Sequence, residues 1–125
     1  MKLRLLGDTL RLRLKRSEIE RLAGLGVVEE VVRFSAGTFR YALVLDEKVA
    51  TPTAELSDGG IRVRLPRREG LEWCRSDVVT LAGNEGTPAI LIERDFVRSA
   101  VQEPDDFDRF TNPRSGRVPP PGPDL

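Results

Sequence analysis

The sequence predicts a mainly β protein with short helices, in which two similar units share one closed β-barrel. Aliphatic and polar residues alternate in residues 2–6 and 10–14, a pattern that favours β-strands. The stretch LRLRL at residues 10–14 returns fifty-one residues later as IRVRL at residues 61–65. A glycine-containing turn precedes each copy and a short helical segment follows it. These observations indicate an internal repeat.

The first unit is predicted to hold a strand, a short helix and a hairpin. In SEIERLAGLG, Ser17 is a candidate N-cap, apolar residues recur at helical spacing, and glycines end the helix. Residues 27–34 and 38–46 are rich in β-branched and aromatic residues and flank a short turn, which is typical of a β-hairpin. The first unit is therefore β-α-β-β and covers about residues 1–48.

The second unit repeats this order over about residues 52–98. After IRVRL comes REGLEWCRSD, a candidate helical turn, and then VVTLAG and PAILIERDFV, which read as strands. At the offset of fifty-one, basic residues align with basic residues and aliphatic residues with aliphatic ones. The aligned pairs include Arg11 with Arg62, Arg13 with Arg64, Leu14 with Leu65 and Arg16 with Arg67.

A β-rich unit of this size cannot bury its own apolar face, so the two units are expected to interleave around one core. Strands with inward Leu, Ile and Val side chains can close on themselves, which removes exposed strand edges. We expect residues 1–98 to form one β-barrel domain, as a monomer with pseudo-twofold symmetry or as a homodimer. Residues 101–125 are acidic and proline-rich, and we expect them to form a flexible tail.

The composition argues against several classes of function. Twenty basic and twenty acidic residues give no net charge, and we find no run of eighteen apolar residues, so we expect a cytoplasmic protein without membrane contact. Without histidine, the usual catalytic triads and tetrahedral zinc sites lack their residues. A glycine-rich phosphate loop is also missing. We therefore expect no enzymatic activity, no metal and no cofactor.

Two segments resemble the swapped-hairpin domains of the AbrB and MazE families. GDTLRLRLKRSEIERLAGLG is similar to the family opening, where a strand of the form G-N-S-x-x-V-R-I-P runs into a short helix, and GGIRVRLPRREGLEWCRSDVV is similar to it again. The whole chain also resembles a set of short bacterial proteins of unknown function that end in an acidic tail. The resemblance to AbrB and MazE implies that two β-α-β-β repeats interleave into one closed, swapped-hairpin or double-psi-like barrel.

The same resemblance implies binding of double-stranded DNA by an AbrB-like transcriptional regulator, through basic residues near the first strand of each copy. Arg13 and Arg64 match the arginine of V-R-I-P, whereas Asp8 and Lys15 depart from the family asparagine and proline. The candidate nucleic-acid-binding residues are Arg4, Arg11, Arg13, Lys15, Arg16, Arg62, Arg64, Arg67 and Arg68.

The alternative function is a non-catalytic scaffold that binds a protein or a small ligand. Its strand arginines would lie on a solvated face and pair with acids such as Glu29, Glu30 or Glu93. The tail could bind a protein partner as antitoxin tails do, through Asp105, Asp106, Phe107, Asp108 and Phe110. One continuous stripe of cations over residues 2–16 and 62–68 would favour DNA, and acids that interrupt it would favour the scaffold.

Overall fold

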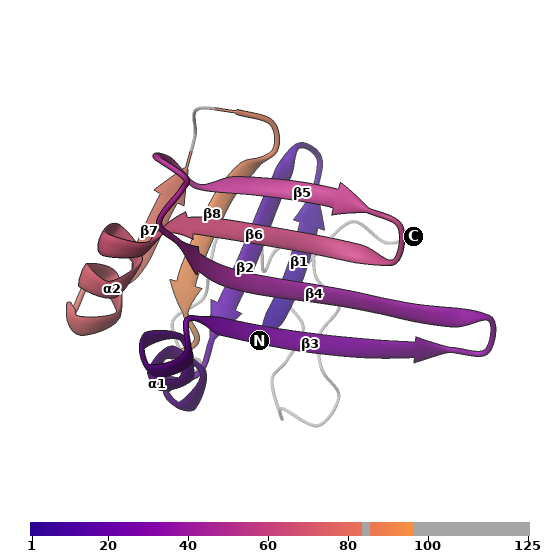
Figure 1. The fold of residues 1–125 in the computed structure, drawn as a ribbon, viewed down its shortest axis with the longest axis horizontal. Helices are drawn as coiled ribbons and strands as arrows, with labels where there is room; N and C mark the ends of the chain where they lie inside the picture. Colours follow the sequence, from indigo (N-terminus) through magenta and orange to yellow (C-terminus); the bar gives the residue numbers. More distant parts are fainter. Residues whose placement is uncertain (84–85, 97–125) are drawn as a thin grey trace, which may run out of the picture.

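The computed structural model describes residues 1–83 and 86–96 of the chain. These residues form eight strands and two short helices (Figure 1), so the prediction of a mainly β protein is confirmed. The elements are β1 (Lys2–Leu6), β2 (Thr9–Leu14), α1 (Arg16–Leu25), β3 (Val27–Phe34), β4 (Gly37–Asp46), β5 (Thr53–Ser57), β6 (Gly60–Pro66), α2 (Arg67–Arg75), β7 (Thr80–Gly83) and β8 (Ala89–Arg94). Neither helix is long and apolar enough to cross a membrane, as far as the chain is described.

The strands form two sheets, and each sheet takes strands from both halves of the chain. The first sheet has the order β1-β2-β8-β7 and the second has the order β3-β4-β6-β5. β2 pairs with β8 in parallel, and β4 pairs with β6 in parallel, while the outer pairs are antiparallel hairpins. The strands of one sheet run across those of the other, and both helices lie at the same end (Figure 1).

The predicted closed barrel is not what the described strands form. Pairing in the first sheet ends at β1 and β7, and pairing in the second sheet ends at β3 and β5, so neither sheet closes on itself. Each sheet instead covers the apolar face of the other. The barrel prediction assumed that the edge strands must pair with each other to close the core. Because the core is buried between two stacked sheets, this pairing is not required.

Each half of the described chain holds two hairpins around a helix, so the predicted β-α-β-β unit was too short. β5, β6 and α2 begin fifty-one residues after β1, β2 and α1, respectively. The sequence-based prediction missed β5: the segment TAELS alternates polar and apolar residues, but it is short and offers only Ala54 and Leu56 as apolar groups. In the first half, the strand predicted over residues 2–6 is present as β1 and belongs to the unit.

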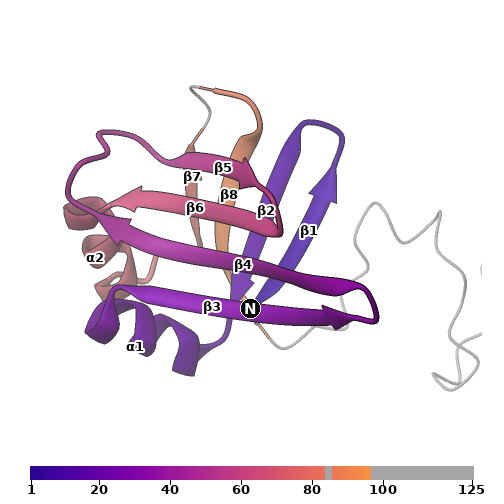
Figure 2. The same cartoon turned by 45° about the vertical axis from the view of Figure 1, so that its right-hand side comes forward.

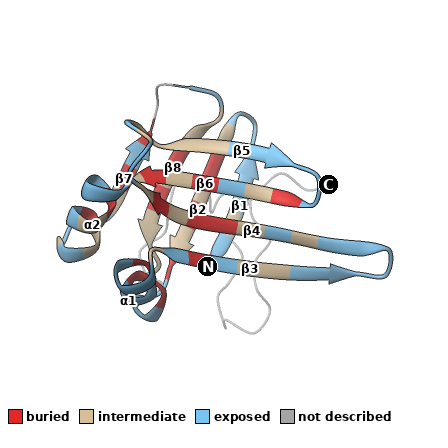
Figure 3. Cartoon of the chain, viewed as in Figure 1, coloured by how far each residue is buried: buried red, intermediate tan, exposed pale blue. Residues whose placement is uncertain are grey.

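The leucines of LRLRL form the centre of the core. Leu10, Leu12 and Leu14 are at most 2% exposed, and their counterparts Val63 and Leu65 on β6 are buried as deeply. The two sheets and the two helices all contribute to this cluster, which appears as buried segments between the sheets (Figure 3). The remaining members include Ile19, Leu22, Val28, Leu43, Leu45, Trp73, Leu81, Ile90 and Ile92.

The first helix begins earlier than its sequence indicates. Lys15, not Ser17, is the N-cap of α1, because the Glu18 carboxylate accepts a hydrogen bond from the Lys15 backbone N–H at 2.9 Å. The helix ends at Gly26, whose φ of 77° places it in the left-handed region that glycine adopts without strain. Ser17 lies in the first turn and is exposed.

The second helix is held at its C-terminal end by Arg94 of β8. The Arg94 guanidinium donates to the carbonyl oxygen of Trp73 at 2.9 Å and to that of Val78 at 3.2 Å. It also lies 5.0 Å from the centre of the Trp73 ring. A cation at this position satisfies carbonyl groups that a helix end leaves free, so Arg94 ties α2 to the first sheet.

Candidate functional site

Four cations lie on the outer surface of the hairpin β1–β2. In the antiparallel register, Lys2 is opposite Arg13 and Arg4 is opposite Arg11. These side chains point away from the core because they alternate with the inward leucines. Like charges directly opposite each other on one face destabilise a strand pair. We call the surface formed by Lys2, Arg4, Arg11 and Arg13 the cationic face.

Two acids partly neutralise the cationic face. Glu93 of β8 lies 3.3 Å from Arg11 Nε and 3.4 Å from Arg13 Nε, and Asp95 Oδ2 lies 3.1 Å from Lys2 Nζ. Among the described residues, Arg4 forms no ion pair. Within the same part of the chain, the buried Nε of Arg11 has no hydrogen-bond partner. The face therefore keeps an excess of positive charge, and the contact between Arg11 Nε and Glu93 is an ion pair without hydrogen-bond geometry.

The corresponding surface of β5 and β6 is neutralised. Glu55 is opposite Arg62 in the strand register, where the first half has Arg4 opposite Arg11. Arg64 donates to Glu55 Oε1 at 3.0 Å and to Asp46 Oδ2 at 2.8 Å.

These contacts change the acid–base properties of both partners. The bonds to Glu55 and Asp46 raise the pKa of Arg64. The backbone N–H of Lys48, together with Arg64, lowers the pKa of Asp46. Arg64 is thus held as a structural cation on the second sheet.

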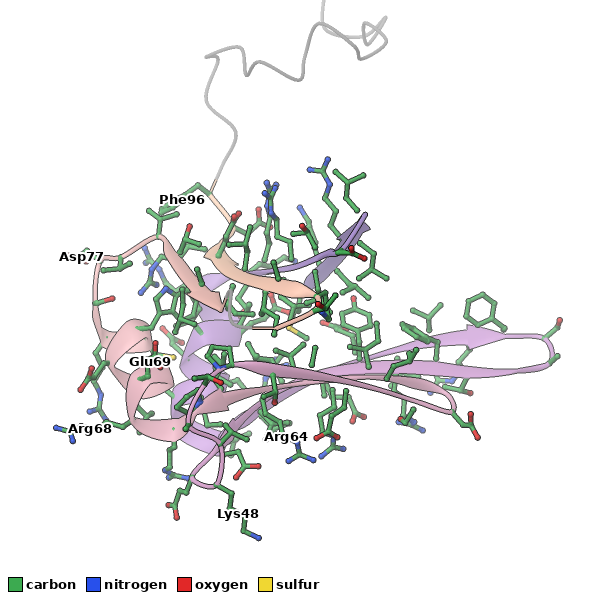
Figure 4. All side chains as sticks on the ribbon, turned by 90° about the horizontal axis from the view of Figure 1, so that it is seen from above. Lys48, Arg64, Arg68, Glu69, Asp77 and Phe96 are labelled. Atoms are coloured by element: carbon green, nitrogen blue, oxygen red, sulfur yellow. The ribbon has the colours of Figure 1, made fainter. Side chains whose placement is uncertain are left out.

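The basic residues at the helix starts are exposed. Arg67 Nε lies 3.8 Å from Glu47 Oε1, and Arg68 Nε lies 3.5 Å from Glu72 Oε1. Arg67 and Arg68 line an open groove of about 520 Å³ whose apolar wall includes Leu71. Figure 4 shows Arg68 pointing outward from α2. The equivalent residues of the first half, Lys15 and Arg16, are exposed at the start of α1.

The candidate cations therefore do not form one stripe. The strand cations of the first half lie on β1 and β2, and those of the second half lie on β6 in the other sheet, with acids beside them in both places. The other four candidates lie at the starts of the two helices. In Figure 4, Arg64 and Phe96 lie on opposite sides of the molecule. By the criterion drawn from the sequence, this interruption favours the scaffold over a DNA interface that spans both halves, and it leaves the cationic face of the first half as the surface on which DNA binding would have to depend. The tail candidates Asp105, Asp106, Phe107, Asp108 and Phe110 lie outside the described residues.

A comparison with protein families matches residues 1–114 to the family described as "Family of unknown function (DUF7009)". The chain belongs to this family. The expected kinship with proteins of unknown function is thereby confirmed, whereas the resemblance to AbrB and MazE stays a prediction. Comparisons with curated proteins and with solved structures gave no match.

The DUF7009 match also covers part of the C-terminal segment. It continues eighteen residues beyond Phe96, the last described residue, and so includes the acidic and aromatic stretch at residues 103–110.

Sequence reasoning missed a buried polar cluster in this DUF7009 chain. The N-terminal ammonium of Met1 forms ion pairs with Glu18 and with Glu30, the latter at 2.9 Å, and Tyr41 Oη donates to the Met1 carbonyl at 2.7 Å. Burial and the neighbouring carboxylates raise the pKa of Tyr41. Burial of Glu18 opposes ionisation, but hydrogen bonds from the ammonium and from the Lys15 N–H leave its pKa lowered.

The partners expected for the strand arginines are therefore only partly correct. Glu93 pairs with Arg11 and Arg13 as expected, but Glu30 pairs with the N-terminus and Glu29 pairs with Arg40 at 3.2 Å. Lys2 is a further member of the cationic face that the sequence did not indicate. Only the strand register shows that Lys2 lies opposite Arg13 and so belongs to this surface.

Proposed function

We propose that this protein is a non-catalytic binding protein whose cationic face binds double-stranded DNA. The observation that carries the proposal is the pair of like-charge oppositions, Lys2 with Arg13 and Arg4 with Arg11. Such pairs weaken a hairpin, so an anionic partner that relieves the repulsion supplies a reason for them. Glu55 occupies the position in the second half that is equivalent to Arg4, and it lies opposite Arg62. The fold itself therefore does not require two like charges at these positions.

The position of the cations suits contacts with a phosphate backbone. They lie on the outer surface of β1 and β2, at the edge of a four-stranded sheet, where a duplex can approach them. Cations on neighbouring strands, spaced by two residues along each strand, occupy a patch about 10 Å across. The resemblance to AbrB and MazE, which implies DNA contacts near the first strand, points to the same hairpin. Lys15 and Arg16 follow directly on β2 and would extend these contacts.

A protein-binding scaffold is the second candidate function. The observation that favours it is the pairing of Glu93 with Arg11 and Arg13, and of Asp46 and Glu55 with Arg64. Those arginines would then form ion pairs that stabilise the surfaces of the sheets, and a protein partner would be bound elsewhere on the chain. The acidic and aromatic stretch at residues 103–110 is the candidate contact.

Binding of a fluorescent random-sequence 20-bp duplex, followed by anisotropy, tests the DNA proposal. Four phosphate contacts give a slope of about −3.6 in log K against log salt, so affinity is expected to fall roughly 10²-fold between 50 and 200 mM salt. The double variant Arg4→Gln/Arg11→Gln is expected to abolish most of this binding.

The matched control is Arg33→Gln/Arg40→Gln, which removes the same charge from the outer surface of the second sheet. This control is expected to bind as the wild type does. Absence of binding at 50 mM salt, or an equal loss in both double variants, would contradict the proposal and favour the scaffold.

A further inference from the structure

Several apolar side chains face the core side of the two sheets and yet are exposed. Val32 and Phe34 share the face of buried Val28 along β3, and they are 42% and 64% exposed. Leu5 lies two residues after the inward Leu3 on β1, and Leu56 lies two residues after the inward Ala54 on β5, so each shares the face of its inward neighbour. Leu5 is 58% exposed and Leu56 is 84% exposed. Phe39 on β4 is opposite Val32 in the strand register and is half-buried. We call the surface formed by Leu5, Val32, Phe34, Phe39 and Leu56 the ledge.

The ledge exists because the sheets do not overlap along their full lengths. The first sheet ends at β1, and the hairpin β3–β4 projects past it (Figures 1 and 2). Figure 3 shows the projecting part as exposed. The inner face of the hairpin is therefore left without a covering layer, beside a strand whose outer edge pairs with no described strand. Exposed apolar side chains on an uncovered sheet face mark an interaction site.

We propose that residues 103–110 of the same chain dock on the ledge, with Phe107 and Phe110 packed against it. The described chain ends beside β1, because the Asp95 carboxylate pairs with Lys2 at 3.1 Å and the Asp95 N–H donates to the Leu14 carbonyl at 2.9 Å. Phe96, which follows, is 63% exposed. The following residues thus start next to the edge strand that borders the ledge.

The length of the following segment is sufficient. From Phe96 to Phe107 and Phe110 there are eleven and fourteen residues, which can span up to about 36 and 46 Å. The longest strand, β4, has ten residues and rises about 33 Å. Both rings can therefore reach the projecting hairpin from the end of β8.

The chemistry of the segment also matches the surface. Its two aromatic rings suit the apolar ledge on the core side of the sheets, and its acids Glu103, Asp105, Asp106 and Asp108 suit the cations Lys2 and Arg4 on the outer side of the bordering strand, for which the segment and duplex DNA would compete. The family match extends to residue 114, so this stretch belongs to the common unit of the family, whereas residues 115–125 do not. The chain itself thus supplies an occupant with the required apolar groups and charge.

Hydrogen–deuterium exchange of the full chain, read by mass spectrometry, tests the docking without any added polyanion and so independently of DNA binding. In Phe107→Ser/Phe110→Ser, amides of residues 2–6 and 31–39 are expected to exchange about tenfold faster than in the wild type, because burial of one phenyl ring is worth at least that factor. Phe34→Ser is expected to accelerate exchange in residues 103–110. The matched control, deletion of residues 115–125, is expected to leave both regions unchanged.

Amides of β6 report on the fold in every variant, and their exchange is expected to stay constant. Equal exchange of residues 2–6 and 31–39 in the wild type and in the double variant would overturn the proposal. Protection that disappears on dilution and persists in the double variant would also overturn it, because a second copy of the chain would then cover the ledge.

Discussion

Exchange of charge at two equivalent positions tests whether the cationic face is under repulsion. Arg4 on β1 is opposite Arg11, and Glu55, fifty-one residues later on β5, is opposite Arg62. Arg4→Glu gives the first half the charge pattern of the second, and Glu55→Arg gives the second half the pattern of the first. Stability is expected to change in opposite directions, with Arg4→Glu more stable and Glu55→Arg less stable than the wild type.

The magnitude for Arg4→Glu follows from cross-strand pairs. Each such pair contributes roughly 0.2–1 kcal/mol, and the substitution both removes a repulsion and adds an attraction. We expect an increase of about 1 kcal/mol in the free energy of unfolding, which corresponds to about 4–8 °C in Tm for a domain of this size. In 1 M salt the Debye length falls to about 3 Å, so most of the gain is expected to disappear.

Thermal and urea unfolding followed by circular dichroism, at low and at high salt, provide the measurement. Arg33→Glu, on the outer surface of β3, is the matched control for the change in net charge. If Arg4→Glu lowers Tm at low salt, or if both exchanges shift Tm in the same direction, the cross-strand repulsion is not a property of the folded protein. Arg4→Glu is also expected to weaken binding of duplex DNA, so stability and binding should change in opposite senses.

Three further predictions concern the fold. Gly60→Ala is expected to cost about 3 kcal/mol or more, because the added Cβ would collide with the Arg40 backbone, whereas Gly24→Ala in α1 meets no atom and is expected to add about 0.5–1 kcal/mol; urea unfolding compares the two. Glu18→Gln is expected to cost about 3 kcal/mol at pH 7, because it leaves the buried Met1 ammonium short of a partner. Since the pKa of Glu18 is lowered in the folded chain, its contribution is present at neutral pH and is lost as the pH falls through the carboxyl range, so the variant should show a weaker loss of stability between about pH 5 and 3. An equally steep acid transition in the variant would refute this assignment. Arg94→Met is expected to cost about 2 kcal/mol, because it removes the donor to the carbonyls at the end of α2, and Arg75→Met, on an exposed site of the same turn, is expected to cost little; comparable losses of Tm in both would speak against the role of Arg94.

Much of the local structure could be predicted from residue patterns. The alternation in LRLRL and IRVRL predicted strands with inward aliphatic side chains, and Leu10, Leu12, Val63 and Leu65 are indeed buried. Gly26 ends the first helix, and the turn at Gly7 precedes β2. These features are predictable because they depend on side-chain periodicity and on backbone conformations that glycine alone adopts easily.

The candidate site was less predictable, because it depends on which strands become neighbours. Arg13 meets Glu93, eighty residues away, only through the parallel pairing of β2 with β8. The basic residues of the second half looked like those of the first, yet Asp46 and Glu55 neutralise Arg64 after β4 and β5 take their places beside β6. The sequence pattern contains no signal for these long-range partners.

The sequence by itself determined the alternation of strands, the two helices and the inward leucines of the repeated stretch, since these follow from interactions between residues close in the chain. The tertiary structure alone decided that the sheets remain open, that the cationic face belongs to the first half, and that the hairpin β3–β4 projects past β1 to leave the ledge uncovered. Those properties depend on strand order and register, which the buried surfaces of the whole chain select together.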